Sequence, residues 1–398
     1  MEQPSRVLII GGGIAGLALA IHLKRVGVSS RVFEAYPEPA TIGGGFQIAP
    51  NGMRVLASLG IADRFAAVGT ETGVFCFRNH HGRIVGRVDL TRAGVGVIAT
   101  RRSLQELLIA AAAREGVTVE YGKRVAALEQ DDRSVVARFD DGTAACGDVL
   151  FGADGVHSRI RGAILPDFAQ PRYTGVIAVG GFVAPGAPLP SDPRDAHQLN
   201  FMMGARLQFG YGMLNEQTPR WGWWSHLPQE RELTRRELQA IADSELQATL
   251  LREFRGWSDP VEPFLRATSQ ILRTAVYDVP QLPTWHVGRV MLLGDAAHAM
   301  SPAGGQGASL ALEDAMAIAR EIARTPRDID RAFAEVERRL RRRAEGVVAQ
   351  ARSNDERQLQ TLGPFGQWAR DRLFPLFAPL IGRQLERLYA GVDGLTAA

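Results

Sequence analysis

The stretch Arg6–Ala35, RVLIIGGGIAGLALAIHLKRVGVSSRVFEA, predicts a strand, a tight turn, a helix and a second strand. Val7–Ile10 is a short apolar run rich in branched side chains, which is typical of a buried parallel strand. Gly11, Gly13 and Gly16 follow in G-x-G-x-x-G spacing. The first glycine permits a sharp turn, the second a close approach to a phosphate, and the third close packing of the helix on the strand. The stretch therefore predicts a phosphate-binding turn.

The residues on both sides of the turn indicate a dinucleotide. The helix begins at the turn, near Ala15, and its unpaired amides and positive dipole end would face phosphates. The second strand, Arg31–Phe33, ends at Glu34, which is placed to accept hydrogen bonds from ribose hydroxyls. An acid there favours an unphosphorylated adenosine ribose, as in FAD or NAD. The motif does not distinguish these two molecules.

The composition is that of a soluble protein of about two domains: 398 residues, 45% hydrophobic and 22% charged. A formal net charge of +3 gives no case for nucleic-acid binding. The two cysteines, Cys76 and Cys146, are too few for a disulfide framework and fit a reducing cytosol. No apolar run approaches the ~20 residues that span a bilayer, and the first strand begins too early for a signal peptide. We expect a cytoplasmic monomer or homodimer.

The hydrophobic patterning divides the chain into segments of two kinds. Helix-strand units dominate the first part and return after residue 280, whereas residues 172–280 have period-2 patterns and more proline and tryptophan. The predicted fold is α/β, and α+β overall. We predict a dinucleotide-binding domain from residues 1–72, 98–171 and 281–330, a hairpin at 73–97 that joins the second domain, a substrate domain at 172–280, and a helical segment at 331–398.

Three local signals lie between the first strands and residue 120. Gly43–Gly45 would let backbone lie flat against a planar ligand, or would simply make a flexible loop. A helix is expected to begin at Ser103, with Arg101 and Arg102 at its amino end, where a bound anion would explain the cations. His80 and the histidine after it have no third ligand at metal spacing, so exposed turn histidines are favoured over a metal site.

Aromatic residues mark the second domain. Phe209, Tyr211 and Met213 alternate on one face of a strand, and Trp223 follows a polar turn. Such a face would line an apolar pocket, or would make the core of the domain. Residues 235–254 form an amphipathic pattern that predicts one helix covering this sheet.

The last dinucleotide-binding segment is RVMLLGDAAHAMSPAGGQGASLALEDA. It predicts a strand at Val290–Leu293 that ends at Asp295, an irregular loop, and a long helix beginning near Gly305. The tail is predicted to be mostly helical. Its run ERRLRRRAEG favours a solvated helix face, with closure over the dinucleotide as the alternative.

The segments GGGIAG with FEA, FGADGVHSRIR and RVMLLGDAAHAMSPAGGQGASLALEDA occur in this order, and together they resemble one family. The chain is similar to the single-component FAD-dependent monooxygenases of the aromatic-hydroxylase type, such as the salicylate, para-hydroxybenzoate and urate hydroxylases and zeaxanthin epoxidase. The resemblance covers nearly the whole chain. It implies a Rossmann-like FAD-binding domain with an inserted antiparallel β-sheet substrate domain and a C-terminal helical segment.

The resemblance also implies which residues hold tight, non-covalent FAD. Arg101 would meet the phosphate-ribitol region, Val125 the adenine side, and Asp295 the ribitol, while Asp154 and Gly155 belong to a motif tied to FAD and NAD(P)H. The full set of implied FAD contacts is Gly11, Gly13, Ala15, Gly16, Glu34, Ala35, Gly45, Phe46, Gln47, Arg101, Val125, Asp154, Gly155, Asp295, Gly305, Gln306, Gly307, Ala308 and Ser309.

Two positions depart from the family pattern. Many members have asparagine where this chain has Ser309, and the urate-type enzymes have an acid where it has Ala303. The first change weakens the expected flavin contact, and the second weakens the case for a urate-like substrate. No second dinucleotide fold is expected, so NAD(P)H would bind transiently across the FAD domain.

The family reaction gives the expected function. NAD(P)H reduces FAD, dioxygen adds to give a 4a-hydroperoxyflavin, and one oxygen atom passes to an electron-rich, aromatic or polyketide-like small molecule, by hydroxylation or epoxidation. The flavin does this chemistry, so no catalytic side chain is assigned. The alternatives are a flavin-dependent halogenase and a non-catalytic flavin-binding protein. The halogenase is disfavoured because Ser225 and His226 replace the Ile-Pro of its tryptophan motif and no lysine is suitably placed.

Overall fold

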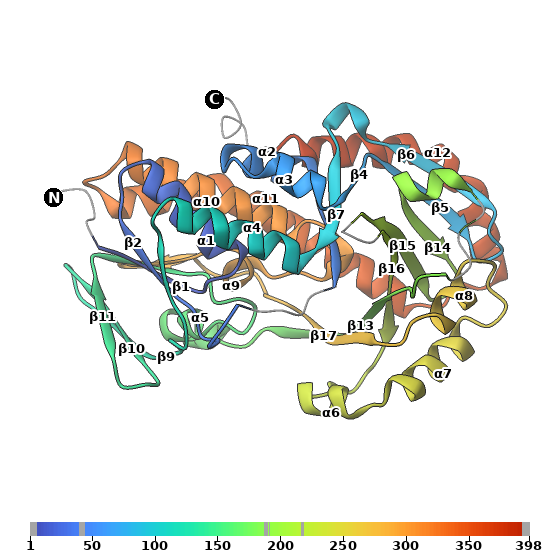
Figure 1. The fold of residues 1–398 in the computed structure, drawn as a ribbon, viewed down its shortest axis with the longest axis horizontal. Coiled ribbons are helices and arrows are strands. Elements are labelled where there is room, and N and C mark those ends of the chain that lie inside the picture. The colour runs from blue at the N-terminus through green and yellow to red at the C-terminus, as the bar shows by residue number, and fades with distance from the viewer. Residues whose placement is uncertain (1–5, 40–43, 187–189, 191, 216–218, 392–398) are drawn as a thin grey trace.

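The computed structural model describes residues 6–39, 44–186, 190, 192–215 and 219–391. Figure 1 shows an elongated molecule with a parallel sheet towards one end and a larger antiparallel sheet towards the other. The predicted mixed α/β fold class is confirmed. Gly43, one of the glycines expected beside a planar ligand, lies outside the described residues.

A six-stranded sheet in the order β18-β19-β12-β1-β2-β8 forms the base of the first region. Its neighbours are parallel except for the β18–β19 pair. All residues of the two central strands, β1 and β12, are buried, which explains their unbroken apolar sequences. The strands are β1 (Val7–Ile10), β2 (Ser30–Phe33), β8 (Thr118–Glu120), β12 (Val149–Gly152), β18 (His286–Val287) and β19 (Val290–Leu292).

Helices and a small sheet cover the parallel sheet. Helix α1 (Ile14–Arg25) packs on both α4 (Arg101–Arg114) and α10 (Gly307–Arg324) above the sheet in Figure 1, and an antiparallel sheet lies below. That sheet has β9 (Val125–Gln130), β10 (Val135–Phe139) and β11 (Ala144–Gly147). Short helices α5 (Arg159–Ile164) and α9 (Asp295–His298) follow β12 and β19.

A three-stranded sheet, β3-β7-β4, connects the two regions. It contains β3 (Gly45–Ile48), β4 (Thr70–Thr72) and β7 (Gly96–Thr100), with α2 (Pro50–Ser58) and α3 (Ala62–Ala67) between the first two. The helix after β7 begins two residues earlier than expected. Thr100, rather than Ser103, is its N-cap, and the Thr100 side chain accepts a hydrogen bond from the Ser103 amide.

The second region is a seven-stranded sheet in the order β17-β13-β16-β15-β14-β5-β6, antiparallel except for the β14–β5 pair. The predicted hairpin supplies its last two strands, and we infer that residues 73–97 and 172–280 form one unit. The strands are β5 (Val74–Asn79), β6 (Ile84–Asp89), β13 (Arg172–Phe182), β14 (Leu199–Met203), β15 (Gln208–Leu214), β16 (Arg220–Pro228) and β17 (Ile271–Asp278).

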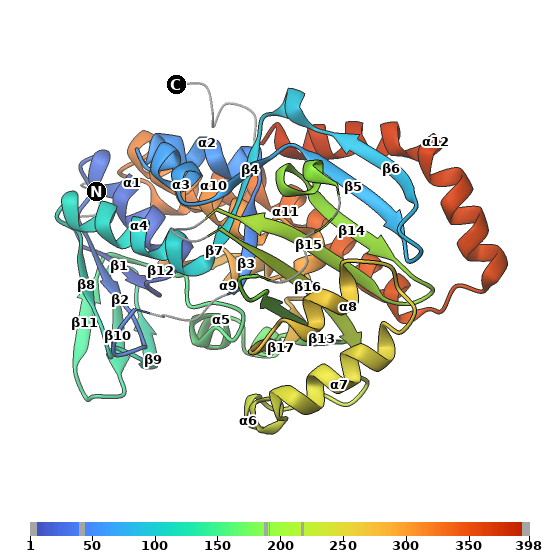
Figure 2. The ribbon, with the colours of Figure 1, turned by 45° about the vertical axis from the view of Figure 1, so that its right-hand side comes forward.

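Helices cover both faces of this sheet. Figure 2 shows α6 (Arg235–Ala240), α7 (Asp243–Glu253) and α8 (Val261–Arg266) on one side and α12 (Pro364–Tyr389) on the other. The single helix predicted for residues 235–254 is therefore two helices. The chain is extended at Ile241, where ψ is 123°, and Asp243 at the start of α7 pairs with Arg273 of β17 at 2.9 Å. This ion pair joins the start of the second helix to the sheet.

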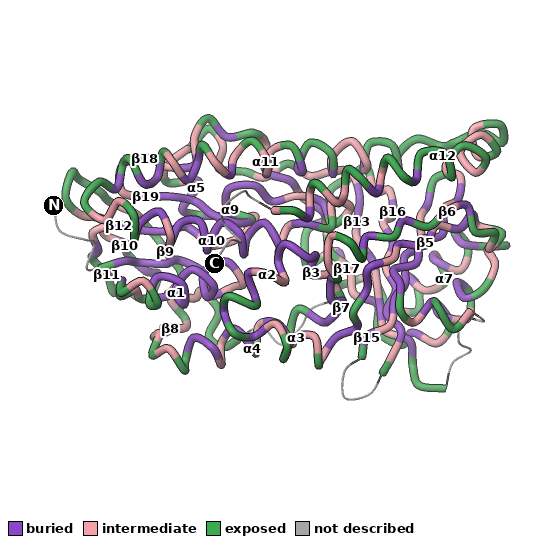
Figure 3. Tube along the Cα trace, turned by 90° about the horizontal axis from the view of Figure 1, so that it is seen from above, coloured by how far each residue is buried: buried purple, intermediate pink, exposed green. Residues whose placement is uncertain are grey.

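The tail is helical, as predicted. Helix α11 (Ile329–Leu359) and then α12 run along the length of the molecule, as Figure 3 shows from above. The arginine-rich run lies on α11. It is only partly solvated, because Arg341 pairs with two glutamates of its own helix and Arg343 pairs with buried Glu313 of α10. The pair between Arg343 and Glu313 attaches α11 to the dinucleotide-binding region.

Candidate flavin and substrate site

The glycine turn has the geometry that a phosphate-binding loop needs. Gly11 has φ of +112°, and a Cβ there would lie 2.2 Å from the Ala153 carbonyl oxygen. A Cβ on Gly16 would lie 1.9 Å from the Gly11 oxygen, whereas a Cβ on Gly13 would meet no atom within 4 Å. The first and third glycines are therefore needed for packing. The second leaves space above the start of α1, which has no side-chain cap and no acid in its first turn.

Glu34 stabilises this turn as well as facing the groove. Its Oε2 accepts a hydrogen bond from the Gly12 amide at 2.7 Å, and its Oε1 accepts one from Tyr36 at 2.9 Å. A carboxylate can accept about four hydrogen bonds, so Glu34 can still accept hydrogen bonds from ribose hydroxyls. Gln105 of α4 completes the loop by donating to the Gly12 carbonyl at 2.6 Å. Sequence reasoning missed Gln105, which lies one helical turn after the expected contact Arg101.

Arg101 lies at the amino end of α4, on the groove side. Its guanidinium lies 5.7 Å from the centre of the Phe46 ring, and its amide donates to the Gly44 carbonyl. This contact joins the start of α4 to β3. The side chain is exposed to the groove, where an anion would complement its charge.

Asp154 and Gly155 follow the buried strand β12. The Asp154 carboxylate accepts hydrogen bonds from the Ser158 hydroxyl at 2.6 Å and the Arg159 amide at 2.8 Å. Burial raises the pKa of Asp154. The Asp154 carboxylate is therefore used to hydrogen-bond the residues at the start of α5. It shapes the groove and is not an unpaired charge available to a ligand. Arg159 in turn donates to the carbonyl of Val125, which lines the groove from the other side.

Asp295 begins α9, immediately after Gly294, whose φ is +57°. Asp314 of α10 holds this turn through two hydrogen bonds. Its Oδ2 accepts a hydrogen bond from the Gly294 amide at 2.9 Å and lies 2.6 Å from His298 Nε2. Burial opposes charge on His298, but the Asp314 carboxylate outweighs burial and raises the pKa of His298. The pair fixes the backbone so that the Asp295 side chain is exposed to the groove.

Helix α10 begins at Gly307, after a turn in which Gly305 has φ of +60°. Its start has no side-chain cap and no acid in the first turn, so its positive end is available to negative charge. Ser309 does not face the groove. Its side chain is buried, and its Oγ accepts a hydrogen bond from the Ala49 amide at 3.1 Å. Ser309 therefore joins α10 to the start of α2.

One cavity of about 1730 Å³ connects these groups with the large sheet. Gly16 and Ser309 are outside its lining. The expected FAD contacts that line it are Gly11, Gly13, Ala15, Glu34, Ala35, Gly45, Phe46, Gln47, Arg101, Val125, Asp154, Gly155, Asp295, Gly305, Gln306, Gly307 and Ala308.

The expected substrate residues on β15 face the other way. Phe209 and Tyr211 are buried among residues of α7 and α8, and Met213 packs on the same cluster. Alternate residues of a strand point to opposite faces, so Gln208, Gly210, Gly212 and Leu214 line the cavity instead. The assignment of Phe209, Tyr211 and Met213 to the pocket is corrected accordingly.

Trp223 is part of the cavity lining, but its ring belongs to the core. The ring stacks on Phe209 at 5.4 Å between centroids, and its Nε1 donates to Thr268 at 2.8 Å. The next residue, Trp224, occupies the cavity side. A Cβ on Gly210 would lie 2.2 Å from the Trp224 ring, so glycine in β15 makes room for the indole. Besides Trp223, the aromatic residues that line this half of the cavity are Phe75, Phe77, Phe182, Phe201, Trp224, Phe374 and Tyr389.

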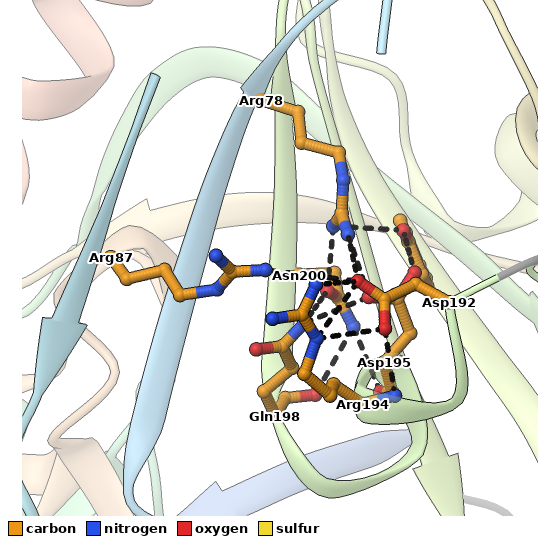
Figure 4. Close-up of polar contacts among 8 residues, drawn as sticks. Arg78, Arg87, Asp192, Arg194, Asp195, Gln198 and Asn200 are labelled. Carbon is orange, nitrogen blue, oxygen red and sulfur yellow. Dashed lines mark hydrogen bonds and ion pairs between the residues drawn. The ribbon is translucent and has the colours of Figure 1, made fainter. Parts of the chain in front are cut away.

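A buried polar network holds the opposite face of the sheet. Figure 4 shows the Arg78 side chain of β5 pointing toward acids and amides that lie just before β14 and at its start. Arg78 donates to Asp195 at 2.7 Å and to Asn200 at 2.8 Å, and the Tyr211 hydroxyl donates to Asp195 at 2.9 Å. Burial raises the pKa of Tyr211. This network explains Tyr211 as a structural residue.

The charges along the cavity are unevenly distributed. Among the described lining residues, the acids are Glu34, Glu38, Asp154 and Asp295, all in the dinucleotide-binding region. The described residues that line the half beside the large sheet include arginines and no acid. Those arginines are Arg206, Arg273, Arg357 and Arg370.

Comparison with known proteins identifies the family. A family model described as FAD binding domain matches residues 5–351. The chain belongs to this family. It is 31% identical to the salicylate hydroxylase of Pseudomonas putida over 81% of this chain and 78% of that protein. It is 33% identical to the 3-amino-4-hydroxybenzoate 2-monooxygenase of Streptomyces cremeus over 79% and 77% of the two chains.

A solved structure gives the same result for the whole fold. Klebsiella pneumoniae HpxO, complexed with FAD and uric acid, superposes with a TM-score of 0.84 at 27% identity, over 97% of each chain. The chain is thus an FAD-dependent monooxygenase of the aromatic-hydroxylase type. Its groove fits the cofactor, because the open space above Gly13, the carboxylate of Glu34 and the exposed Asp295 lie along one cavity. In the described part of the chain, no helix is long and apolar enough to cross a membrane.

Proposed function

We propose that this flavoenzyme uses NAD(P)H and dioxygen to hydroxylate or epoxidise an electron-rich, aromatic or polyketide-like small molecule. The observation that carries the proposal is the continuity of the cavity, which runs from the dinucleotide turn to an aromatic wall on the large sheet. Its volume of about 1730 Å³ exceeds the 300–1,000 Å³ typical of a single ligand pocket. Space for a second molecule beside FAD supports a reaction between the two.

When bound, FAD supplies the oxygen chemistry, and the protein supplies position and electrostatics. Glu34 and Asp295 offer carboxylate acceptors for sugar and ribitol hydroxyls at two places along the groove. The uncapped start of α10, at Gly307 and Ala308, would stabilise negative charge on the flavin. We propose that the implied contacts which line the cavity hold FAD, and that Gly16 and Ser309 act by packing.

The wall beside the large sheet limits the substrate class. Phe201 and Trp224 provide ring faces for an apolar, planar molecule. Because the described lining there includes arginines and no acid, a neutral or anionic substrate is favoured over a cation. Three of these arginines, Arg206, Arg273 and Arg370, are already paired with Glu253, Asp243 and Asp371, so their charge is partly compensated.

The decisive experiment is a screen of aromatic and polyketide-like compounds for stimulated NAD(P)H oxidation, followed by mass spectrometry of the product formed under isotopically labelled dioxygen. We expect one labelled oxygen atom per product molecule and one NAD(P)H consumed per turnover. An unlabelled product or a simple reduction without oxygen would refute the proposal. Halide incorporation would assign the halogenase reaction instead.

A further inference from the structure

Helix α12 has an exposed apolar face on its outer side. The side chains of Phe365, Leu376 and Leu380 are 78%, 73% and 64% exposed. The complete outer α12 face consists of Phe365, Trp368, Leu373, Leu376, Phe377 and Leu380. Phe365 and Trp368 are three residues apart, and both Leu376 and Phe377 lie three or four residues from Leu373 and from Leu380, as residues on one side of a helix do. Large apolar patches on monomers usually mark a binding surface.

The inner face of the same helix packs against the rest of the protein. Ala378 and Tyr389 are buried, and Phe374 packs on Phe77 of β5 with 4.8 Å between ring centroids. Figure 3 shows α12 along the outer edge of the molecule, with exposed positions on the side away from the sheets. The outer face is therefore not needed to hold α12 in place.

The charges around the outer α12 face are positive. Arg372, Arg383 and Arg387 are exposed, and none of them makes an ion pair with another described residue. The two acids of the helix are less accessible: Asp371 accepts hydrogen bonds from Asn79 and Arg370, and Glu386 is half-buried. An occupant of this face must therefore combine apolar groups with negative charge.

We propose that the outer α12 face docks on an anionic lipid surface. Its exposed tryptophan, phenylalanines and leucines suit the boundary between headgroups and acyl chains, and its arginines suit acidic headgroups. A second copy of the chain fits less well, because a two-fold contact of this face with itself would oppose arginines to arginines. Pro375 and Pro379 lie inside the helix, and no helix of the described residues is long and apolar enough to cross a bilayer, so α12 would lie along the lipid surface.

The helix also forms one wall of the cavity. Arg370, Phe374 and Leu385 line the cavity from the inner side of α12, and Leu362, which is 40% exposed, lines it just before the helix begins. Docking would thus bring the cavity wall close to the bilayer and give apolar substrates a short path into the site. This consequence rests on the proposed function, whereas the docking itself does not.

The test is co-sedimentation of the full-length, FAD-loaded protein with vesicles of phosphatidylcholine and phosphatidylglycerol in equal parts, and with vesicles of phosphatidylcholine alone. We expect binding to the mixed vesicles that weakens with salt and is at least about ten-fold weaker without phosphatidylglycerol. The triple variant Leu376→Ser, Phe377→Ser and Leu380→Ser should lose binding and keep its flavin. Val287→Ser, an exposed apolar residue on β18, is the matched control.

Two results would overturn the docking proposal. One is a wild-type protein that stays in solution with mixed vesicles while it is folded and yellow. The other is a homodimer that fails to bind vesicles and that the triple variant dissociates, which would assign the face to a second copy.

The variant Arg383→Gln with Arg387→Gln should retain residual binding but lose most of the preference for anionic vesicles, which separates the charge from the apolar contribution. Neither readout requires turnover, so failure here leaves the monooxygenase proposal standing.

Discussion

The three glycines of the first turn act in different ways although they share one motif. The space around each residue gives Gly11 and Gly16 a packing role and Gly13 an open position above the start of α1. We predict that Gly13→Ala folds normally but binds FAD at least about ten-fold more weakly, because a methyl group would occupy the phosphate position.

Gly16→Ala should instead destabilise the protein itself, because its methyl carbon would lie 1.9 Å from the Gly11 carbonyl oxygen, far inside van der Waals contact. Chemical unfolding and flavin fluorescence, measured on both variants, check the contrast. Equal loss of stability in the two variants would contradict it.

Asp355 of α11 gives a pH-dependent prediction. It is buried, its Oδ1 accepts a hydrogen bond from Ser301 at 2.9 Å, and its Oδ2 has no partner. Burial raises the pKa of Asp355 to about 6 from the usual 3.8. A raised pKa means that the folded state holds the proton more tightly than the unfolded state. The stability from this group is complete below pH ~4 and is lost as the pH rises through ~6.

Asp355→Asn removes this titration and keeps an acceptor for Ser301. Between pH 4 and 7 its free energy of unfolding should rise relative to wild type by about 2–3 kcal/mol. Urea unfolding at several pH values measures the difference. A difference that is constant with pH would show that Asp355 does not titrate in this range.

At the scale of single residues, the sequence predicted well which side chains line the groove. It predicted less well the contacts that hold those side chains in position. The spacing of the glycines and of Glu34 is local, so it could be interpreted directly. The hydrogen bond from Gln105 to Gly12 joins residues 93 positions apart and leaves no local pattern. The same applies to the pairing of Ser309 with Ala49, which no spacing rule predicts.

At the scale of elements, alternation predicted that β15 has two faces but not which one lines the cavity. Neither face carries a charged residue, because one packs on α7 and α8 and the other lines a pocket. The useful signal was glycine: Gly210 and Gly212 alternate with Phe209 and Tyr211, and small residues are expected on the face that must leave space.

Substitutions on the two faces of this sheet should separate binding from stability. Trp224→Ala should raise KM for the substrate found in the compound screen by at least about ten-fold and leave the unfolding midpoint nearly unchanged. Tyr211→Phe should do the opposite, because it removes a hydroxyl from a buried network at a cost of about 1–3 kcal/mol. If Tyr211→Phe changed KM at normal stability, the assignment of the faces would be wrong.

At the scale of the whole molecule, the order of the segments predicted the fold class, but contacts between distant segments complete the site. The cavity takes Gly11 from the first of the three dinucleotide-binding segments, Asp154 from the second and Asp295 from the third, and α12 forms its far wall. The family resemblance predicted this assembly, since the three motifs occur in order. The outer face of α12 is the part that no motif indicated.

Because the groove collects distant segments, FAD should stabilise the molecule as a unit. At about one hundred times its Kd, FAD should add about 2.7 kcal/mol to the free energy of unfolding, and removal of the flavin should lower Tm accordingly.

ADP, which has only the adenosine half, should give part of this shift. Asp295→Ala should reduce the FAD shift to nearly that of ADP, because it removes the acceptor assigned to ribitol, while Glu34→Ala should reduce both shifts. Thermal unfolding of the three proteins with each nucleotide measures these effects. An Asp295→Ala variant that keeps the full FAD shift would place the ribitol elsewhere, and a Tm independent of FAD in the wild-type protein would show that the groove is not the cofactor site.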